Sequence, residues 1–251
     1  MKAGGLAQGV FGLVALLVVA VALGVAGCGG GNSLRVSAAA SLRSAFTRYG
    51  AMFGHTVFSF GGSDQLAAQI RAGARPQVFA SANRELPDQL FAAGLVERPV
   101  PFATNRLVLA VPAHGARVSS LAQLGRPGLR IAIGAPSVPV GAYTAKVLAR
   151  LGAEGQKIRA NVRSQEPSVD GIVGKLTTGG ADAGFLYITD VTAVHGALRA
   201  IELPRTARPA VVYAAAVVRG GEEARARQFI AGLLGGPGAA ALAAAGFGPA
   251  P

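Results

Sequence analysis

The sequence predicts an α/β fold built as two lobes, on three observations. From Leu34 onward, short apolar runs alternate with stretches whose apolar residues recur at helical spacing, which is typical of α/β lobes. The chain has 251 residues, enough for two lobes of roughly 100 residues each. Hydrophobic residues make up 51% and charged residues 14% of the chain, so each lobe can bury a core. The predicted strands are Leu34–Ala38, Val57–Phe60, Val78–Ala80, Leu107–Val111, Arg130–Ile133, Ala183–Tyr187 and Val211–Val218.

The N-terminus carries the most specific local pattern. Lys2 precedes an apolar stretch that ends in Val25-Ala26-Gly27-Cys28. A basic residue, an apolar region and small residues before a cut site are typical of a secretory signal, and the last four residues resemble the lipobox of bacterial lipoproteins. We predict a signal peptide at 1–27, a lipid on Cys28 and a flexible tether at 28–33. The protein is therefore expected outside the cytoplasm, anchored to the cell membrane.

An uncleaved transmembrane helix is the alternative for this segment, because the apolar stretch is close to the length needed to span a bilayer. No basic cluster follows it, and Cys28 is the only cysteine of the chain. A lone thiol in an exported protein has no disulfide partner, and lipidation accounts for it. Both observations favour the lipoprotein signal.

The charge balance argues against nucleic acid as a partner. Lys and Arg number 24 and Asp and Glu 12, a formal net charge of +12. The arginines are scattered singly rather than clustered with aromatic residues on one element, so nucleic-acid binding is not expected. An anionic membrane surface or an anionic ligand remains consistent with this charge.

Four of the predicted helices begin at recognisable start signals. The first two begin at Ser41 and Ser63, each directly after a predicted strand, and the other two at Val140 and Val169, each shortly after a proline. A helix N-terminus has unpaired N–H groups and a partial positive charge, which favour an anion. Turns from strand to helix also line the ligand crevice of open α/β sheets. Singly, each serine is consistent with a helix cap and each valine with the core; together they predict an anion site.

Five stretches of sequence, in order along the chain, carry a family resemblance. They are Ala38-Ala39-Ala40-Ser41-Leu42, Phe60-Gly61-Gly62-Ser63, Arg71-Ala72-Gly73-Ala74 with Val78-Phe79-Ala80-Ser81-Ala82, Pro139-Val140-Gly141-Ala142-Tyr143, and Gly184-Phe185-Leu186-Tyr187-Ile188-Thr189-Asp190. The set resembles the molybdate-binding proteins of ABC transporters. The likeness runs from about Leu34 to the closing Gly246-Phe247-Gly248-Pro249.

This resemblance implies a two-lobed type II periplasmic binding protein fold with a ligand cleft between the lobes. Lobe 1 would comprise 34–105 and 212–251, and lobe 2 would comprise 106–211, joined by two hinge crossovers near Asn105–Leu107 and Val211–Val212. The protein would be a monomer without cofactor that delivers its ligand to a permease and ATPase complex. Closure about the hinge would be favoured by the bound anion.

The resemblance also implies the residues that bind the anion. Ser41 and Ser63 would donate hydroxyl and backbone N–H groups, Val140 and Val169 backbone N–H groups, and Tyr187 its phenol. No residue is expected to be catalytic or to bind a metal cation directly, because molybdenum would be held as its oxyanion.

The proposed donors are all neutral, which restricts the anion. Phosphate keeps a proton at neutral pH and would need an acceptor, whereas sulfate, molybdate and tungstate are fully ionised. Asp64 and Asp170, in the first turns of their helices, are expected to point outward and stabilise the helix dipole. If either points inward, phosphate or metal-type coordination becomes an alternative. Molybdate, with tungstate as a second ligand, is chosen over sulfate on the resemblance alone.

A purely structural surface lipoprotein is disfavoured by the ordered set of motifs, which leaves two other functions as alternatives. One is a binding protein of the same fold for sulfate, phosphate or a small organic anion, although no arginine lies at any of the four helix tips to clamp an organic anion. The other is a secreted hydrolase, with Ser41, His55 and Asp64, or Ser63, His114 and Asp190, as a triad. The chain has no Gly-x-Ser-x-Gly turn, so an enzyme is not expected.

Overall fold

The computed structural model describes residues 33–221 and 223–251. The predicted signal peptide at 1–27, Cys28 and all of the predicted tether at 28–33 except its last residue lie outside the described residues. Within the described part of the chain, no helix has the length and apolar character that a membrane crossing requires.

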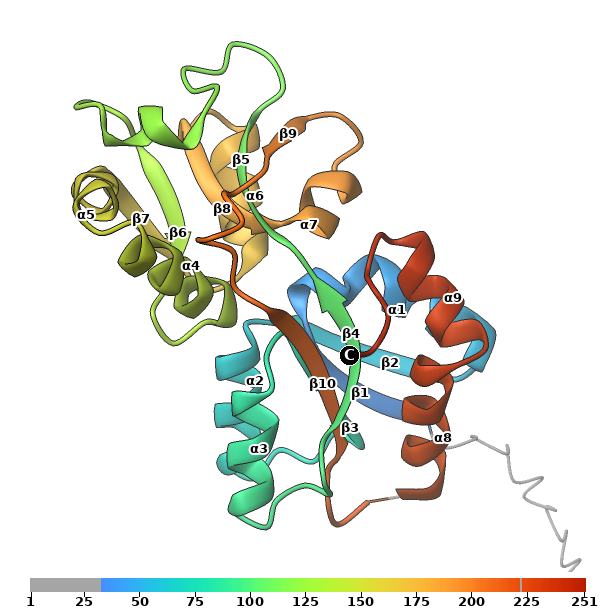
Figure 1. Ribbon diagram of the computed structural model, residues 1–251. Coiled ribbons are helices and arrows are strands. Elements are labelled where there is room, and N and C mark those ends of the chain that lie inside the picture. Colours follow the sequence, from blue (N-terminus) through green and yellow to red (C-terminus); the bar gives the residue numbers. More distant parts are fainter. Residues whose placement is uncertain (1–32, 222) are drawn as a thin grey trace, which may run out of the picture. The chain divides into compact units, whose positions relative to one another are not determined.

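Lobe 1 is built on a five-stranded sheet in the order β2-β1-β3-β10-β4. The first three strands along the chain are parallel to one another, and β10 is antiparallel to both β3 and β4. Helices α2 and α3 cover one face, and α1, α8 and α9 cover the other (Figure 1). The elements are β1 Leu34–Ala39, η1 (a short 3₁₀ helix) Ala40–Leu42, α1 Arg43–Phe53, β2 Thr56–Gly61, α2 Ser63–Arg71, β3 Val78–Ser81, α3 Glu85–Ala92, β4 Val100–Asn105, β10 Val211–Val217, α8 Glu223–Leu234 and α9 Pro237–Ala244.

Lobe 2 is built on a second five-stranded sheet, in the order β7-β6-β8-β5-β9. Strand β6 is parallel to both β7 and β8, and β5 is antiparallel to β8 and β9. The elements are β5 Leu107–Pro112, η2 Leu121–Gly125, β6 Ile131–Gly134, α4 Pro139–Arg150, α5 Ala153–Ala160, β7 Val162–Glu166, α6 Val169–Thr177, β8 Ala183–Tyr187, α7 Ile188–Ala193 and β9 Leu198–Ile201.

The chain passes twice between the two sheets. Arg106 joins β4 to β5, and residues 202–210 join β9 to β10, so that the first sheet takes strands from both ends of the described chain. Figure 1 shows both crossings close to the point where the lobes meet. The predicted fold class, α/β in two lobes, is confirmed.

The sequence did not predict three strands, β4, β7 and β9. All three lie at the edge of a sheet. An edge strand has one neighbour and is open to solvent, so it needs fewer apolar residues than an interior strand. Strand β7 reads Val-Arg-Ser-Gln-Glu and is exposed at alternate positions, and β4 contains Pro101, which has no N–H for a ladder.

The aromatic core of lobe 1 packs α1 against α8. Phe229 on α8 contacts the rings of Phe46 and Tyr49 on α1, with centroids 5.5 and 4.6 Å away. The Tyr49 hydroxyl also donates to the carbonyl of Phe229 at 3.1 Å. This packing fixes α1 and, with it, the turn that precedes it in the sequence, where Ser41 lies.

Candidate ligand-binding site

A small cavity lies between the lobes, where the parallel strands of both sheets end. It measures about 210 Å³ between atoms, counting the part open to solvent. Because this volume includes open solvent, the enclosed space is smaller still, so the cavity suits a small ion rather than a larger organic ligand. Its lining consists of Ala39, Ala40, Ser41, Gly61, Gly62, Ser63, Ala82, Val138, Pro139, Val140, Ser168, Val169 and Tyr187.

Lobe 1 contributes the two serines through neighbouring strands. Strands β1 and β2 are parallel and in register, with Ala39 opposite Gly61. The turns that follow them therefore lie side by side at one edge of the sheet, and bring Ser41 and Ser63 to the same cavity.

Neither serine caps a helix, contrary to the start signal read from the sequence. Ser41 lies within η1, and Gly62, not Ser63, is the N-cap of α2. The Ser63 oxygen instead accepts a hydrogen bond from the Ala82 N–H at 3.2 Å, and the Ser41 oxygen lies 2.8 Å from the Tyr213 hydroxyl. A serine oxygen that accepts such a bond keeps its own proton for another partner.

Lobe 2 contributes two helix N-termini by the same geometry. Strands β6 and β7 are parallel neighbours, with Gly134 opposite Glu166, and α4 and α6 begin shortly after them. Val140 and Val169 lie in the first turns of these helices and both line the cavity. Backbone N–H groups in a first helical turn have no partner within the helix, so they are free to bind an anion.

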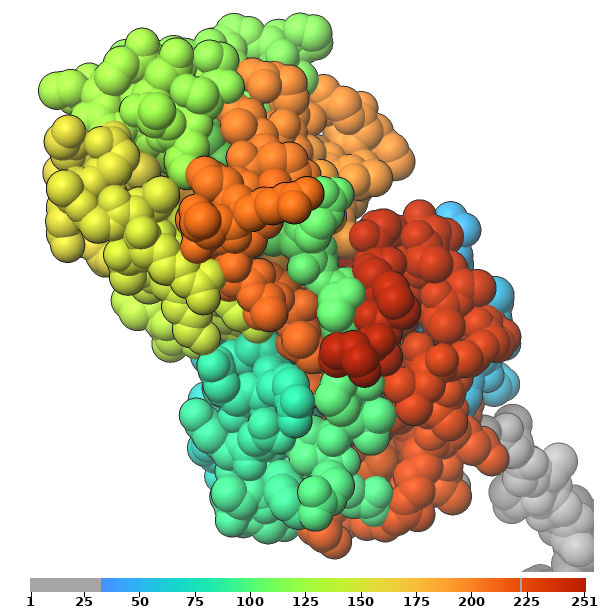
Figure 2. Space-filling model, viewed as in Figure 1, coloured from blue at the N-terminus to red at the C-terminus, as the bar shows by residue number. Residues whose placement is uncertain are grey.

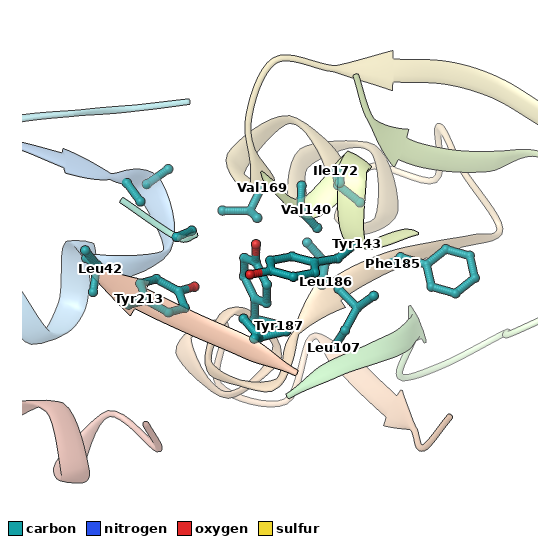
Figure 3. Packing of buried hydrophobic residues seen from close by; sticks show 14 of the residues in the cluster. Leu42, Leu107, Val140, Tyr143, Val169, Ile172, Phe185, Leu186, Tyr187 and Tyr213 are labelled. Carbon is teal, nitrogen blue, oxygen red and sulfur yellow. The ribbon is translucent and has the colours of Figure 1, made fainter. Parts of the chain in front are cut away.

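Tyr187 is the last residue of β8, and its hydroxyl lacks a partner. The residue is 1% exposed, and its oxygen makes no hydrogen bond of normal length to a described residue, although the Tyr213 hydroxyl lies close enough to add to the rise in its pKa. In Figure 3 the hydroxyl points from the end of β8 toward Val140 and Val169. Burial raises the pKa of Tyr187 well above its usual value, so the phenol stays protonated and can donate. A buried hydroxyl without a partner costs about 1–3 kcal/mol, which a bound anion would offset.

The charged residues around the cavity belong to its rim. None of the described residues in the lining carries a charge. Asp170 is 54% exposed in its side chain and pairs with Arg43 at 2.9 Å. Asp64 is half-buried; one carboxylate oxygen accepts from the Ser137 hydroxyl at 2.6 Å, and the other is buried without a partner. Both aspartates therefore bridge the lobes rather than line the cavity.

Contacts between the lobes surround the cavity. Besides these two bridges, Lys146 on α4 pairs with Glu85 on α3 at 3.3 Å. Figure 2 shows the region of α4, in yellow-green, against the cyan part of lobe 1. At Gly62 the approach is closer still, since a Cβ on this residue would lie 2.3 Å from the carbonyl oxygen of Pro167 in lobe 2. The lobes are in contact around the cavity.

A buried carboxyl lies directly behind Tyr187. Asp190, in the first turn of α7, is 7% exposed and accepts a hydrogen bond from the Tyr187 N–H at 3.0 Å. Burial raises the pKa of Asp190 to about 8; the Tyr187 N–H opposes this shift, and the negative charge of Asp170 adds to it. The carboxyl is therefore largely neutral at pH 7.

Asp190 is expected to make stability fall as pH rises. Its folded pKa of about 8 exceeds the ordinary 3.8, so its contribution to the free energy of unfolding is fully present below about pH 3.8 and is lost as pH rises through about 8. We expect the free energy of unfolding of the wild type, minus that of Asp190→Asn, to fall between about pH 5 and pH 9. Asparagine keeps an acceptor for the Tyr187 N–H and does not titrate. Urea unfolding across this range measures the difference; a constant value would contradict the prediction.

The geometry separates the residues of both hydrolase triads. His55 precedes β2, whereas Ser41 and Asp64 lie beyond the opposite end of the β1–β2 pair, a strand length of about 20 Å away. His114 follows β5, whose first residue, Leu107, pairs with Tyr187, so His114 lies at the far end from the cavity. In the described residues, no group of three His, Cys, Asp or Glu could hold a metal ion.

Comparisons with known proteins agree with this site and fold. Residues 34–248 match the model of the bacterial extracellular solute-binding proteins. The molybdate-binding protein ModA of Mycobacterium tuberculosis is 38% identical over 258 residues, covering 94% of this chain and 96% of the relative. The class that the fold and cavity define is thus an extracytoplasmic binding protein. The chain belongs to the bacterial extracellular solute-binding protein family.

Solved structures of binding proteins share the fold of this chain. The periplasmic molybdate-binding protein of Azotobacter vinelandii superposes with a TM-score of 0.74 at 25% identity, covering 86% of this chain and 98% of that one. The sulfate-binding protein SubI of Mycobacterium tuberculosis has a TM-score of 0.75 at 17% identity, covering 86% of each chain, and shares the fold. The resemblance to molybdate-binding proteins is confirmed, as is the prediction that the chain is not an enzyme.

Sequence reasoning missed several residues at the cavity. Ala82 follows β3, which is parallel to β1, so the rule that ligands lie at the carboxyl ends of parallel strands would have indicated it. Gly62 and Ser168 directly precede predicted residues. Tyr213, which contacts Ser41, lies 172 positions away in the chain, and no local pattern indicated it.

Proposed function

We propose that this chain is the substrate-binding component of an ABC importer, which binds molybdate outside the cytoplasm and delivers it to a permease and ATPase complex. The observation that carries the proposal is the buried Tyr187 hydroxyl, which has no partner and faces a small cavity with an uncharged lining. An oxyanion held there would accept hydrogen bonds from Tyr187, from the hydroxyls of Ser41 and Ser63, and from the N–H groups of Val140 and Val169.

The donor set favours a fully ionised dianion. Every proposed group donates, and no carboxylate lines the cavity to accept the proton that phosphate keeps at neutral pH. Sulfate, molybdate and tungstate all meet this requirement. The relatives of M. tuberculosis and A. vinelandii, both named as molybdate-binding, favour molybdate. Tungstate, which is also a fully ionised dianion, is proposed as a second ligand.

The remaining features of the proposal come from the sequence. Residues 1–27 would be removed as a signal peptide, Cys28 would carry the lipid that anchors the protein, and 28–33 would be its tether. Lobe 1 would comprise 34–105 and 212–251, and lobe 2 would comprise 106–211, with the protein acting as a monomer. Mass spectrometry of the membrane-extracted protein, with Cys28→Ala as the comparison, tests the lipid.

Thermal unfolding with millimolar molybdate, tungstate, sulfate or phosphate tests the ligand. A ligand present at 100 times its dissociation constant stabilises the folded protein by about 2.7 kcal/mol. We expect molybdate and tungstate to stabilise the protein in this way. A shift with sulfate or phosphate alone would change the substrate and keep the class of protein, and no shift with any oxyanion would overturn the proposal.

Replacing Tyr187 by phenylalanine is expected to change affinity and stability in opposite directions. A hydrogen bond to a charged partner contributes about 1.5–3 kcal/mol, so molybdate affinity falls at least about tenfold. Without ligand, the same change removes a buried hydroxyl that has no partner, so stability stays equal or rises. Titration calorimetry and urea unfolding measure the two quantities. Unchanged affinity would show that this hydroxyl does not bind the anion, and a less stable ligand-free protein would show that it has a partner in the protein.

A further inference from the structure

Tyr213 lies behind the proposed anion site without lining it. It is on β10, the strand that follows the second crossover, and is fully buried between Phe102 and Phe247, whose ring centroids lie 6.2 and 5.2 Å from its own. Its hydroxyl oxygen is 2.8 Å from the Ser41 oxygen. In Figure 3 the Tyr213 hydroxyl points toward the side of the cavity where Tyr187 lies.

The neighbouring Asn105 restricts the direction of the hydrogen bond between the Tyr213 and Ser41 hydroxyls. Its Oδ1 accepts the backbone N–H of Arg106 at 2.8 Å, so the other terminal atom of the amide is the NH₂ group, which only donates. This group donates to Thr189 Oγ1 at 2.9 Å and lies 3.5 Å from the Tyr213 oxygen. The Tyr213 oxygen thus faces a donor 3.5 Å away on the Asn105 side, which leaves its own proton available for Ser41 at 2.8 Å.

We propose that Tyr213 is a positioning residue for the anion: its phenol donates to the Ser41 oxygen, so that the Ser41 hydroxyl donates into the cavity. The inference rests on the proposed function, since Ser41 must bind the anion. Ser41 has a single proton, and with its oxygen engaged by Tyr213 that proton is left for the ligand. The donor is oriented before the anion arrives, which lowers the cost of binding.

The phenol of Tyr213 keeps the proton that this direction of donation requires. Burial raises the pKa of the phenol well above its usual value and the nearby Asp190 adds to that effect, whereas the hydrogen bonds with Ser41 and Asn105 oppose it. The phenol therefore keeps its proton throughout the physiological range. An ionised phenolate would accept from Ser41 and turn the serine proton away from the anion.

A double-mutant cycle tests the inference. Molybdate affinity is measured by titration calorimetry for the wild type, Tyr213→Phe, Ser41→Ala and the double variant. Losing one neutral hydrogen bond weakens binding about 3- to 10-fold, which we expect for Tyr213→Phe when Ser41 is present. In the Ser41→Ala background, Tyr213→Phe is expected to cause no further loss. Equal losses in both backgrounds would overturn the inference, because they would mean that Tyr213 acts through packing alone.

The outcomes separate this inference from the proposed function. If Ser41→Ala leaves molybdate affinity unchanged, the proposed site is wrong. If Ser41→Ala weakens binding and Tyr213→Phe does not, the site stands and the positioning role is wrong.

Tyr49→Phe is the matched control. Tyr49 is also a buried tyrosine of lobe 1, with one hydrogen bond, to the carbonyl of Phe229, and it does not line the cavity. The Tyr49→Phe variant is expected to be less stable and to bind molybdate with the wild-type affinity. In Tyr213→Phe the ring remains between Phe102 and Phe247, so that variant is also expected to fold. A loss of affinity in Tyr49→Phe equal to that in Tyr213→Phe would assign both effects to a weakened lobe 1 and overturn the positioning role.

Discussion

Replacing Gly62 by alanine is expected to lower oxyanion affinity by about 5- to 150-fold, one of the two largest effects on binding among these substitutions. Gly62 has φ −62° and ψ 131°, a conformation that any residue adopts, so lobe 1 itself imposes no backbone strain. The added Cβ would lie 2.3 Å from the carbonyl oxygen of Pro167, which belongs to the other lobe. Overpacking of this kind costs about 1–3 kcal/mol. The Cβ would also lie 2.8 Å from Oδ1 of Asp64 in lobe 1, but that atom is the end of a side chain that can turn away, so most of the cost arises when the lobes are together.

The effect of Gly62→Ala separates closure from folding. We expect weaker molybdate binding by calorimetry and an unchanged urea midpoint of the ligand-free protein. The matched control is Gly174→Ala on α6, where a Cβ would meet no atom within 4 Å and affinity is expected to stay at the wild-type value. If Gly62→Ala binds as tightly as the wild type, the ligand is not held by lobes closed in this arrangement.

Replacing Ser63 by alanine is expected to lower both affinity and stability. Its hydroxyl is proposed to donate to the anion, and a hydrogen bond to a charged group is worth about 1.5–3 kcal/mol, so affinity falls roughly 10- to 100-fold. The same oxygen accepts the Ala82 N–H at 3.2 Å in a buried setting, and Ser63 is 2% exposed. Removing it leaves that N–H without this partner and destabilises the ligand-free protein by about 1–3 kcal/mol.

Ser81→Ala is the comparison for Ser63→Ala. Ser81 is likewise a fully buried serine, its hydroxyl donates to Asn83 Oδ1 at 2.9 Å, and it does not line the cavity. We expect it to lose stability and to bind molybdate as the wild type does. The combination of calorimetry and urea unfolding distinguishes the two variants. An equal loss of affinity in both would mean that the Ser63 effect reflects weakened packing rather than a lost contact with the anion.

Local patterns in the sequence determined the fold class, the interior strands and three of the four helix starts. Interior strands such as Ala183–Tyr187 are continuous apolar runs, because both faces of the sheet are covered. The starts near Ser63, Val140 and Val169 follow from serine and proline beside helical periodicity, and helices begin there at Ser63, Pro139 and Val169. The edge strands β4, β7 and β9 lack that apolar signal, since solvent covers part of them.

The tertiary structure alone decided how the parts of the cavity cooperate. The Ser41–Tyr213 contact joins residues 172 positions apart, and the Asp64–Ser137 bridge joins residues 73 apart. The approach of Gly62 to Pro167 depends on two lobes meeting. Hydrogen bonds and close packing of this kind depend on which surfaces the fold brings together, whereas helix starts and strands depend on neighbours along the chain. The sequence therefore determined which groups are available to an anion, and only the fold decided how they are oriented toward it.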